Sequence, residues 1–474
     1  MTKLIISSSE FQAQVADLLP CNRNKKSQLT HSLIDAYHLF EYFDEVVKDP
    51  YCSSSDFLRF HSEPYVEAIT RHDYNQLLPY DKSEESWAQL NEIRDLWLQA
   101  TGVNPQKTYK SRMELYQHFN EIKMNREDDE ETYGNLPLRK KQRMLHEEVL
   151  TDDSVDDNDI LKKKYNLSGD CPIFSYLPMY LQVITGATLS LITDMEKVPK
   201  GSEFERVIGI NWDGGRHHAL RQKAEGFCYI NDIVLLIQAL RKKGFQKISY
   251  IDFDLHHGDG VDNAFKFSNF IQTISLHLYE TGFFPGTGDL NSSKPPYRVN
   301  IPLLHGFDDT NLATIVDRII MPLLNQHEPD VIVIQSGGDG LIGDRFKEWQ
   351  LTIRGLTRAI MDIINTYTSS HIILLGGGGY NELVMSRFNT YLTWSVVRKY
   401  SSHISDGLIK EYIETDDDYM LPDHEFIEMY KEEYYKFWIY DEPGSTRCKK
   451  LINYNKPDTL LKYAKKLVPT IDES

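Results

Sequence analysis

Asp252, Asp254 and His256 stand at alternate positions near the middle of the chain. In extended backbone, residues two apart point to the same side, so these three side chains can converge on one point. Carboxylate oxygens and imidazole nitrogens are ligands that suit a divalent cation. The same residue types at a strand end can also cap a helix or form a turn. The spacing therefore indicates a metal site, with a purely structural turn as the alternative.

The residues around this motif predict the element that positions it. The run from Lys247 to Asp252 is largely apolar, β-branched or aromatic, which predicts a buried strand. Gly258 and Gly260 then break the strand, and residues 261–267 predict the start of a helix. A strand, a ligand-bearing loop and a helix in this order place the motif at the carboxyl end of a strand, where open α/β sheets have their sites.

The same order of strand, loop and helix recurs along the chain. Apolar runs predict strands at residues 3–7, 206–210, 269–278, 330–335 and 371–375, and helical spacing predicts helices at 28–47, 57–69 and 231–242. From residue 206 onward, each strand leads into a glycine-rich loop that carries reactive residue types. This regularity predicts an α/β fold: a single large domain with a mostly parallel sheet flanked by helices, and an active site at the carboxyl ends of the strands.

These loops supply a third candidate metal ligand, Asp339, beside Asp254 and His256. Three protein ligands with an open fourth position are typical of catalytic zinc sites. Because this set is richer in oxygen than the commoner zinc sites, ferrous iron is a chemical rival.

Two adjacent histidines, His217 and His218, are candidates for a general acid and a general base. Asp252 and Asp259 are candidate partners, because a carboxylate bonded to one ring nitrogen fixes the tautomer and raises the basicity of the other nitrogen. Tyr380 is a candidate hydroxyl donor, and an apolar passage would be lined by Phe227, Phe283 and Phe284. Each residue taken singly is more often plain core or surface, but their joint placement at strand ends favours catalysis.

The composition limits the class of protein and of partner. The chain of 474 residues has a formal net charge of −18, with acidic runs at residues 127–131, 152–159 and 416–418. A protein this acidic is not expected to bind nucleic acid directly, although it could bind basic protein tails. The five cysteines are scattered without a Cys-x-x-Cys pair, which favours a reducing compartment. No apolar run approaches the roughly 20 residues of a membrane helix, so we expect an intracellular, soluble protein without a membrane partner.

The charge pattern also indicates how the chain is divided. Residues 76–165 are dense in charge, which predicts an acidic, partly disordered insertion in a catalytic domain of residues 1–440. Residues 441–474 would then form a C-terminal tail. Within the insertion, the basic cluster at residues 137–143 is as consistent with a nuclear import signal as with an exposed, charged helix face.

Several of these stretches occur together in one known family. The motifs are GGRHHA (214–219), GFCYIND (226–232), DFDLHHGDG (252–260), GFFPGTG (282–288), SGGD (336–339), GDR (343–345) and GGGGY (376–380). Together they resemble the class I zinc-dependent histone deacetylases, in particular the Hos-type enzymes of yeast, over residues 4–69 and 169–439.

The resemblance implies an arginase/deacetylase-like fold and a role for each matching residue. Zn²⁺ would be held by Asp254, His256 and Asp339. His217 would pair with Asp252, and His218 with Asp259, with His218 as the proton shuttle and Tyr380 as the donor to the oxyanion. The acetyl-lysine tunnel and its rim would be formed by Asp170, Gly226, Phe227, Phe284 and Gly378. One structural K⁺ would be held by Asp252, Asp254, His256, Ser275 and Leu276, and a second would lie near Phe265 and Ser268.

The activity implied is hydrolysis of the acetyl amide of N6-acetyl-lysine, with release of acetate, in histones or other chromatin proteins such as cohesin. The implied setting is the nucleus, and also the cytoplasm, with corepressor proteins as partners in transcriptional repression. One alternative is an amidohydrolase for acetylated polyamines or other small amides, which would lack a residue such as Asp170 to hold a peptide backbone. Another is an inactive chromatin scaffold, which would be expected to have lost Tyr380 or a metal ligand.

Five positions depart from or qualify the family pattern. Lys26 stands where the family usually has an arginine, Gly169 replaces a larger residue, and Gly340 replaces a small hydroxyl residue. Arg345 matches an inositol-phosphate contact of corepressor-bound relatives, whereas Leu383 stands where a second arginine is expected. This difference argues against inositol-phosphate activation.

Overall fold

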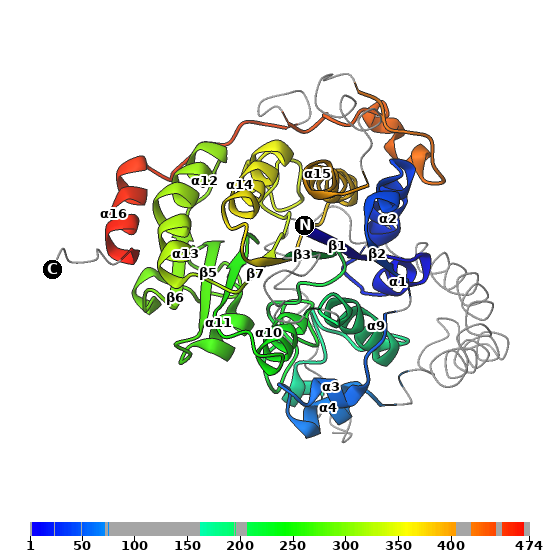
Figure 1. Cartoon of the computed structure of the whole chain (residues 1–474), viewed down its shortest axis with the longest axis horizontal. Coiled ribbons are helices and arrows are strands. Elements are labelled where there is room, and N and C mark those ends of the chain that lie inside the picture. The colour runs from blue at the N-terminus through cyan, green and yellow to red at the C-terminus, as the bar shows by residue number, and fades with distance from the viewer. Residues whose placement is uncertain are drawn as a thin grey trace, which may run out of the picture.

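A single sheet of eight strands forms the centre of the protein (Figure 1). The computed structural model describes residues 2–22, 24–48, 50–71, 74, 162–193, 195, 206–403, 419–441 and 448–468. All strand pairs in the sheet are parallel, in the order β2-β1-β3-β8-β7-β4-β5-β6. The strands are β1 (Thr2–Ser7), β2 (Glu45–Val47), β3 (Arg206–Asn211), β4 (Ile248–Asp252), β5 (Ile271–Leu278), β6 (Arg298–Leu303), β7 (Val331–Gln335) and β8 (His371–Leu375). The predicted α/β class with a parallel sheet is confirmed.

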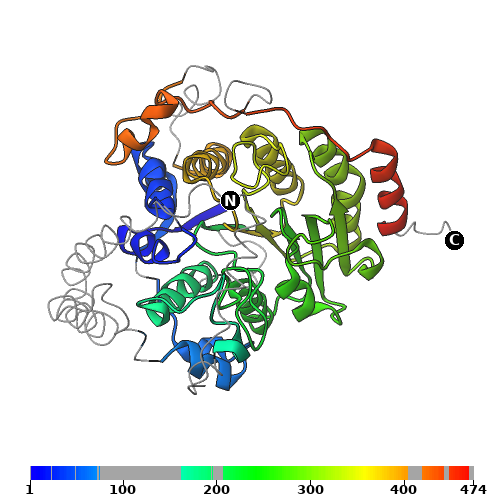
Figure 2. The ribbon, with the colours of Figure 1, turned by 180° about the vertical axis from the view of Figure 1, so that it is seen from behind.

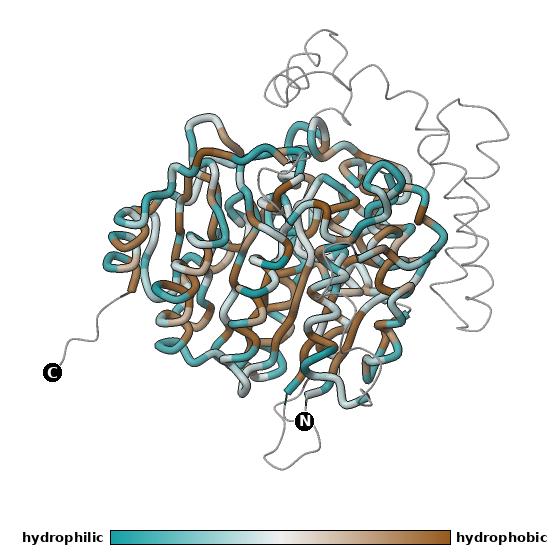
Figure 3. Tube along the Cα trace, turned by 90° about the horizontal axis from the view of Figure 1, so that it is seen from above, coloured by the Kyte–Doolittle hydropathy of each residue, from teal (hydrophilic) through white to brown (hydrophobic). Residues whose placement is uncertain are grey.

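Helices cover both faces of this sheet (Figures 1 and 2). One layer contains α2 (Lys26–Ala36), α12 (Asp309–Ile315), α13 (Met321–His327), α14 (Ile353–Thr366) and α15 (Glu382–Tyr400). The other contains α9 (Leu177–Ser190), α10 (Asp232–Lys242) and α11 (Asp259–Phe265). Alternation along β1 explains the two layers, since Leu4 and Ile6 belong to the hydrophobic cluster on the side of α12, α14 and α15, whereas Ile5 belongs to the cluster that contains residues of α10. Hydrophobic residues accordingly concentrate inside the body and hydrophilic ones along its outline (Figure 3).

The other helices in the described part of the chain are α1 (Glu10–Ala16), α3 (Ser54–Phe57), α4 (Glu63–Ile69) and α16 (Pro457–Leu467). Short 3-10 segments cover Leu39–Tyr42, Leu290–Ser292 and Ile427–Glu433, and one π-helical turn, Val316–Ile320, joins α12 to α13. None of the described helices is long and apolar enough to cross a membrane.

Two predicted helices were too long. The helix predicted over residues 28–47 ends at Ala36, because the chain leaves helical geometry at His38 (φ 55°) and goes on into β2. The helix predicted over 57–69 is two helices, since α3 ends at Phe57 and α4 begins after Ser62 with Pro64 in its first turn. Both predicted helices extended across these breaks because apolar residues continue through the turns, and the prediction relied on the spacing of apolar residues.

The structure describes only the end of the predicted insertion, but most of the predicted C-terminal tail. Most of the predicted insertion, including the basic cluster at 137–143, lies outside the described residues, but its last residue, Tyr165, is buried beside Tyr65. At the other end of the chain, Leu460 and Leu467 of α16 are buried in the same cluster as α12. The described part of residues 441–474 therefore packs on the domain, while the boundary at residue 440 stays a prediction.

Candidate metal centre and active site

Three buried side chains meet at the carboxyl end of the sheet: Asp254, His256 and Asp339. One ligand atom from each lies within 4.8 Å of the others, and all three are at most 5% exposed. Asp254 and His256 follow β4, and Asp339 follows the neighbouring strand β7. Parallel pairing of these strands brings their carboxyl ends together, so the sequence-distant ligand Asp339 joins the other two.

The donor set fits a divalent cation. His256 Nδ1 lies 2.8 Å from Asp339 Oδ2 and 3.3 Å from Asp254 Oδ1. Burial, together with repulsion from the Asp254 carboxylate, raises the pKa of Asp339 to about 7. A bound cation would remove this repulsion, because it stabilises both carboxylates in their charged forms.

Polar groups at the strand ends and in the loops that follow them hold these candidate ligands in place. Gln335 Nε2 and the backbone N–H of Gly378 both donate to Asp254 Oδ2, at 3.0 and 2.8 Å. The backbone N–H of Leu255 donates to Asp339 Oδ1 at 2.8 Å. Such second contacts orient metal ligands. Sequence reasoning missed Gln335, although a lone amide at the end of a buried apolar strand could have indicated it.

The histidine pair lies beside the metal ligands, and each histidine contacts a different aspartate. His217 Nδ1 is 2.8 Å from Asp252 Oδ2, and His218 Nδ1 is 2.7 Å from Asp259 Oδ1. The two rings are 3.9 Å apart between centroids. In each pair the aspartate binds Nδ1, so the Nε2 atom is left as the second, potentially reactive nitrogen.

The two histidines differ in charge. Burial opposes protonation of His217, but the carboxylates of Asp252 and Asp254 outweigh it and raise its pKa to about 9. Burial, followed by the charge of His217, lowers the pKa of His218 to about 4. At neutral pH the pair therefore carries one positive charge, on His217, and the neutral His218 is the member that can accept a proton.

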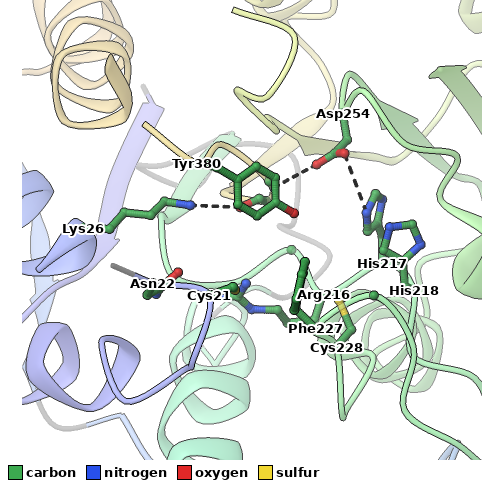
Figure 4. A pocket seen from close by; sticks show the side chains of 14 residues that line it. Cys21, Asn22, Lys26, Arg216, His217, His218, Phe227, Cys228, Asp254 and Tyr380 are labelled. Atoms are coloured by element: carbon green, nitrogen blue, oxygen red, sulfur yellow. Dashed lines mark hydrogen bonds and ion pairs between the residues drawn. The ribbon is translucent and has the colours of Figure 1, made fainter. Parts of the chain in front are cut away.

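Tyr380 faces the same cavity from the loop after β8 (Figure 4). Its backbone N–H donates to Asp344 Oδ2 at 2.6 Å, and its ring packs edge-on against Phe346 at 5.2 Å. Burial, together with the nearby Asp339, raises the pKa of Tyr380 well above its ordinary value of 10.0. The phenol thus stays protonated and can donate a hydrogen bond. Asp344, to which no role was assigned from the sequence, positions this loop.

Aromatic rings and close-packed glycines form a narrow entrance to the site. Phe284 lies edge-on to His218 at 4.9 Å, and Phe227 lies 6.0 Å from the Tyr380 ring. At Gly226 (φ +52°), an added Cβ would lie 2.5 Å from the His218 ring. The Gly226 N–H donates to Asp170 Oδ2 at 3.1 Å, so Asp170 fixes this wall. A Cβ at Gly378 would likewise lie 2.5 Å from Asp339 Oδ2.

The residues implied as potassium ligands fall into two places. Asp252 and Ser275 are paired neighbours on β4 and β5, next to Asp254, His256 and Leu276. Phe265 and Ser268 lie instead at the end of α11, before β5 begins, where the Ser268 N–H donates to the Phe265 carbonyl at 2.8 Å. The structure thus separates this second set from the catalytic edge.

The structure shows the surroundings of four of the five positions that depart from or qualify the family pattern. Lys26 Nζ reaches the Gly377 carbonyl at 3.4 Å beside the cavity, and burial lowers its pKa. A Cβ at Gly340 would lie 2.7 Å from the Trp349 ring. Arg345 pairs with Glu382 at 2.9 Å. Gly169 has φ +63°, which favours glycine.

Comparison with known proteins agrees with this geometry. A family model described as the histone deacetylase domain matches residues 19–396. Histone deacetylase HOS1 of Saccharomyces cerevisiae is 48% identical over 98% of this chain and 99% of its own length. Histone deacetylase 8 of Xenopus tropicalis is 37% identical over 59% of this chain and 70% of its own length. Histone deacetylase B of Dictyostelium discoideum is 38% identical over 49% of this chain and 54% of its own length. The chain therefore belongs to the histone deacetylase family.

Proposed function

We propose that this deacetylase is a zinc-dependent protein lysine deacetylase, which hydrolyses the acetyl amide of N6-acetyl-lysine. The observation that carries the proposal is the buried Asp254–His256–Asp339 cluster beside two histidine–aspartate pairs and a protonated tyrosine. Metal-dependent amide hydrolysis needs a site for a cation, a base for water and a donor for the oxyanion, and this edge of the sheet offers residues for all three.

Asp254, His256 and Asp339 would hold the zinc ion, with Fe²⁺ as the chemical rival and structural K⁺ at the sites described above. When bound, Zn²⁺ would polarise the acetyl carbonyl and make water more acidic. His218, neutral at neutral pH, would take the proton from the attacking water through Nε2. The Tyr380 hydroxyl would donate to the developing oxyanion.

The same proton then completes the reaction. The water oxygen bonds to the acetyl carbon, the carbon–nitrogen bond breaks, and protonated His218 gives its proton to the departing lysine nitrogen. Asp259 would stabilise this protonated form of His218. The positive charge of His217, which Asp252 stabilises, would stabilise the negative charge of the oxyanion. The products are a lysine side chain and acetate.

The entrance suits a long side chain whose polar atoms lie only at its tip. The methylenes of acetyl-lysine would pack between Phe227 and Phe284, past Gly226 and Gly378. Asp170, which already bonds to the Gly226 N–H, would hold the peptide backbone at the rim with its carboxylate. An acetylated polyamine has no peptide backbone for Asp170 to hold, so this contact favours a protein substrate.

The proposed substrates are acetylated histone tails, with cohesin as the second candidate, and the proposed setting is the nucleus with corepressor partners. The names of the relatives support histones. A basic tail also suits a chain with a net charge of −18. Inositol-phosphate binding is not proposed, because Leu383 supplies no cation and Arg345 is paired with Glu382.

The test uses purified full-length protein with acetyl-lysine peptides and with an acetylated polyamine, after metal content has been measured. Zinc at one ion per chain and a higher kcat/KM on peptides are expected. Equal turnover of the polyamine would favour the small-amide alternative, and no turnover of either substrate would refute the proposed activity. In cells, acetyl-lysine proteomics that compares the wild type with His218→Ala would identify the protein substrates and separate histones from cohesin.

A further inference from the structure

Two buried histidines outside the proposed catalytic set lie next to the loop that carries Phe283 and Phe284. His257 is 2% exposed, His277 is 0% exposed, and their rings are 4.5 Å apart. We propose that they form a clamp that fixes the tunnel-wall loop, residues 279–288, in the position that receives the substrate. This inference rests on the proposed function, since it assigns positioning residues to the same site.

The tunnel-wall loop needs an anchor because its tip has few bonds of its own. Among the described residues, the tip (280–286) makes one hydrogen bond, from the Phe283 N–H to the Glu280 carbonyl at 3.1 Å. Yet this tip contributes two rings to the site. Phe283 stacks on the ligand His256 at 5.0 Å, and Phe284 lies edge-on to His218 at 4.9 Å. A shift of the tip would therefore move the tunnel wall relative to the reacting groups.

His257 holds the loop through Thr287. The Asn300 side chain donates its amide N–H to Ser292 Oγ at 3.0 Å, so its oxygen faces His257 Nε2, 2.9 Å away. His257 must then donate through Nε2, because an amide oxygen only accepts. Thr287 Oγ1 lies 2.8 Å from the other ring nitrogen, Nδ1, and forms a hydrogen bond with it. One chain of bonds thus links strand β6 to the loop through the ring.

His277 holds the next residue of the loop by its backbone. His277 Nε2 donates to the Gly288 carbonyl at 2.8 Å, and its Nδ1 lies 3.1 Å from Ser275 Oγ. The Gly258 N–H donates to the same Ser275 Oγ at 3.4 Å. The clamp therefore ties the tunnel-wall loop to the loop that follows the metal ligands.

Gly288 shows how closely the clamp fits. Its φ is +87°, and an added Cβ would lie 2.8 Å from His257 and would also collide with His277. The Thr287 hydroxyl thus binds the His257 ring, and the Gly288 carbonyl binds the His277 ring. Because preorganised walls reduce the cost of ordering on binding, the clamp should act mainly on substrate affinity.

The test is a pair of substitutions at Thr287, which is exposed, so both variants should fold. Thr287→Val keeps the shape and removes the hydroxyl, whereas Thr287→Ser keeps the hydroxyl. Loss of one such hydrogen bond should raise the KM for an acetyl-lysine peptide about threefold to tenfold, with a smaller change in kcat. Hydrogen exchange of residues 279–288 should become faster in Thr287→Val and stay at the wild-type rate in Thr287→Ser. Thr310→Val, on α12, is the matched control and should change neither quantity.

Wild-type KM and exchange rates in Thr287→Val would overturn the clamp. Equal defects in Thr287→Val and Thr287→Ser would also overturn it, because the hydroxyl would then not be the anchor. If the wild-type protein showed no deacetylase activity while exchange followed the expected pattern, the proposed function would fail and the clamp would stand.

Discussion

Replacement of Tyr380 by phenylalanine isolates one hydroxyl in the proposed mechanism. The ring of Tyr380 packs against Phe346 and Phe227, and its backbone N–H bonds to Asp344, so none of these contacts depends on the hydroxyl. The variant should keep its metal and its melting temperature. Removal of one oxyanion donor typically lowers kcat by about 10²–10³-fold, or roughly 2.7–4 kcal/mol of transition-state stabilisation. KM should change little, because the bond forms only as charge develops.

The assay is steady-state turnover of an acetyl-lysine peptide, with zinc measured on the same preparations. Tyr65→Phe is the matched control: its buried hydroxyl donates to the Tyr229 carbonyl at 2.7 Å, away from the cavity. That variant should lose about 0.5–1.5 kcal/mol of stability and keep kcat. A Tyr380→Phe enzyme with near wild-type kcat would refute the assignment of Tyr380 to the oxyanion.

Three further experiments test the ligands, the base and the core. Asp339→Asn should lose metal and activity together, and stoichiometric zinc in the purified variant would contradict the ligand set. His218→Ala should lower kcat more than His217→Ala, with zinc retained in both, since His218 is the neutral member of the pair; greater activity in His218→Ala would reverse the roles. Arg387→Met should cost about 3–5 kcal/mol by leaving the buried Glu433 carboxylate uncompensated, and Glu433→Leu in the same chain should restore much of the melting temperature.

The grouping of the candidate site residues at one edge of the sheet could be predicted from the sequence because its signals are local. Asp252, Asp254 and His256 follow a strand that its apolar run already indicates, and Asp339 follows another. Parallel strands place their carboxyl ends together, so a prediction of strands at these runs is also a prediction that their loops meet. The pairing of each histidine with its aspartate came from the family resemblance, and the structure has the same pairs, since spacing alone offered both carboxylates to both rings.

Helix ends were predicted less well, because apolar residues do not stop where helices stop. The helix ends at Ala36, yet the residues that follow it still pack in or against the hydrophobic cluster that contains residues of α2 and α15: Tyr37, Leu39 and Phe40. The left-handed backbone at His38 ends it, and no glycine or proline marks that turn in the sequence. Strand β6 (Arg298–Leu303) was also missed, because Asn300 and Pro302 interrupt its apolar run.

Asn300 shows why the clamp is hidden in the sequence. A buried asparagine within a strand counts against a strand prediction, yet here its amide oxygen binds one nitrogen of the His257 ring, whose other nitrogen binds Thr287. The three residues come from β6, from the loop after β4 and from the loop after β5, and nothing in their spacing relates them. A buried polar group is retained only where it finds partners. Polar residues that weaken a prediction of secondary structure are therefore the ones to examine for a role in positioning the residues of a site.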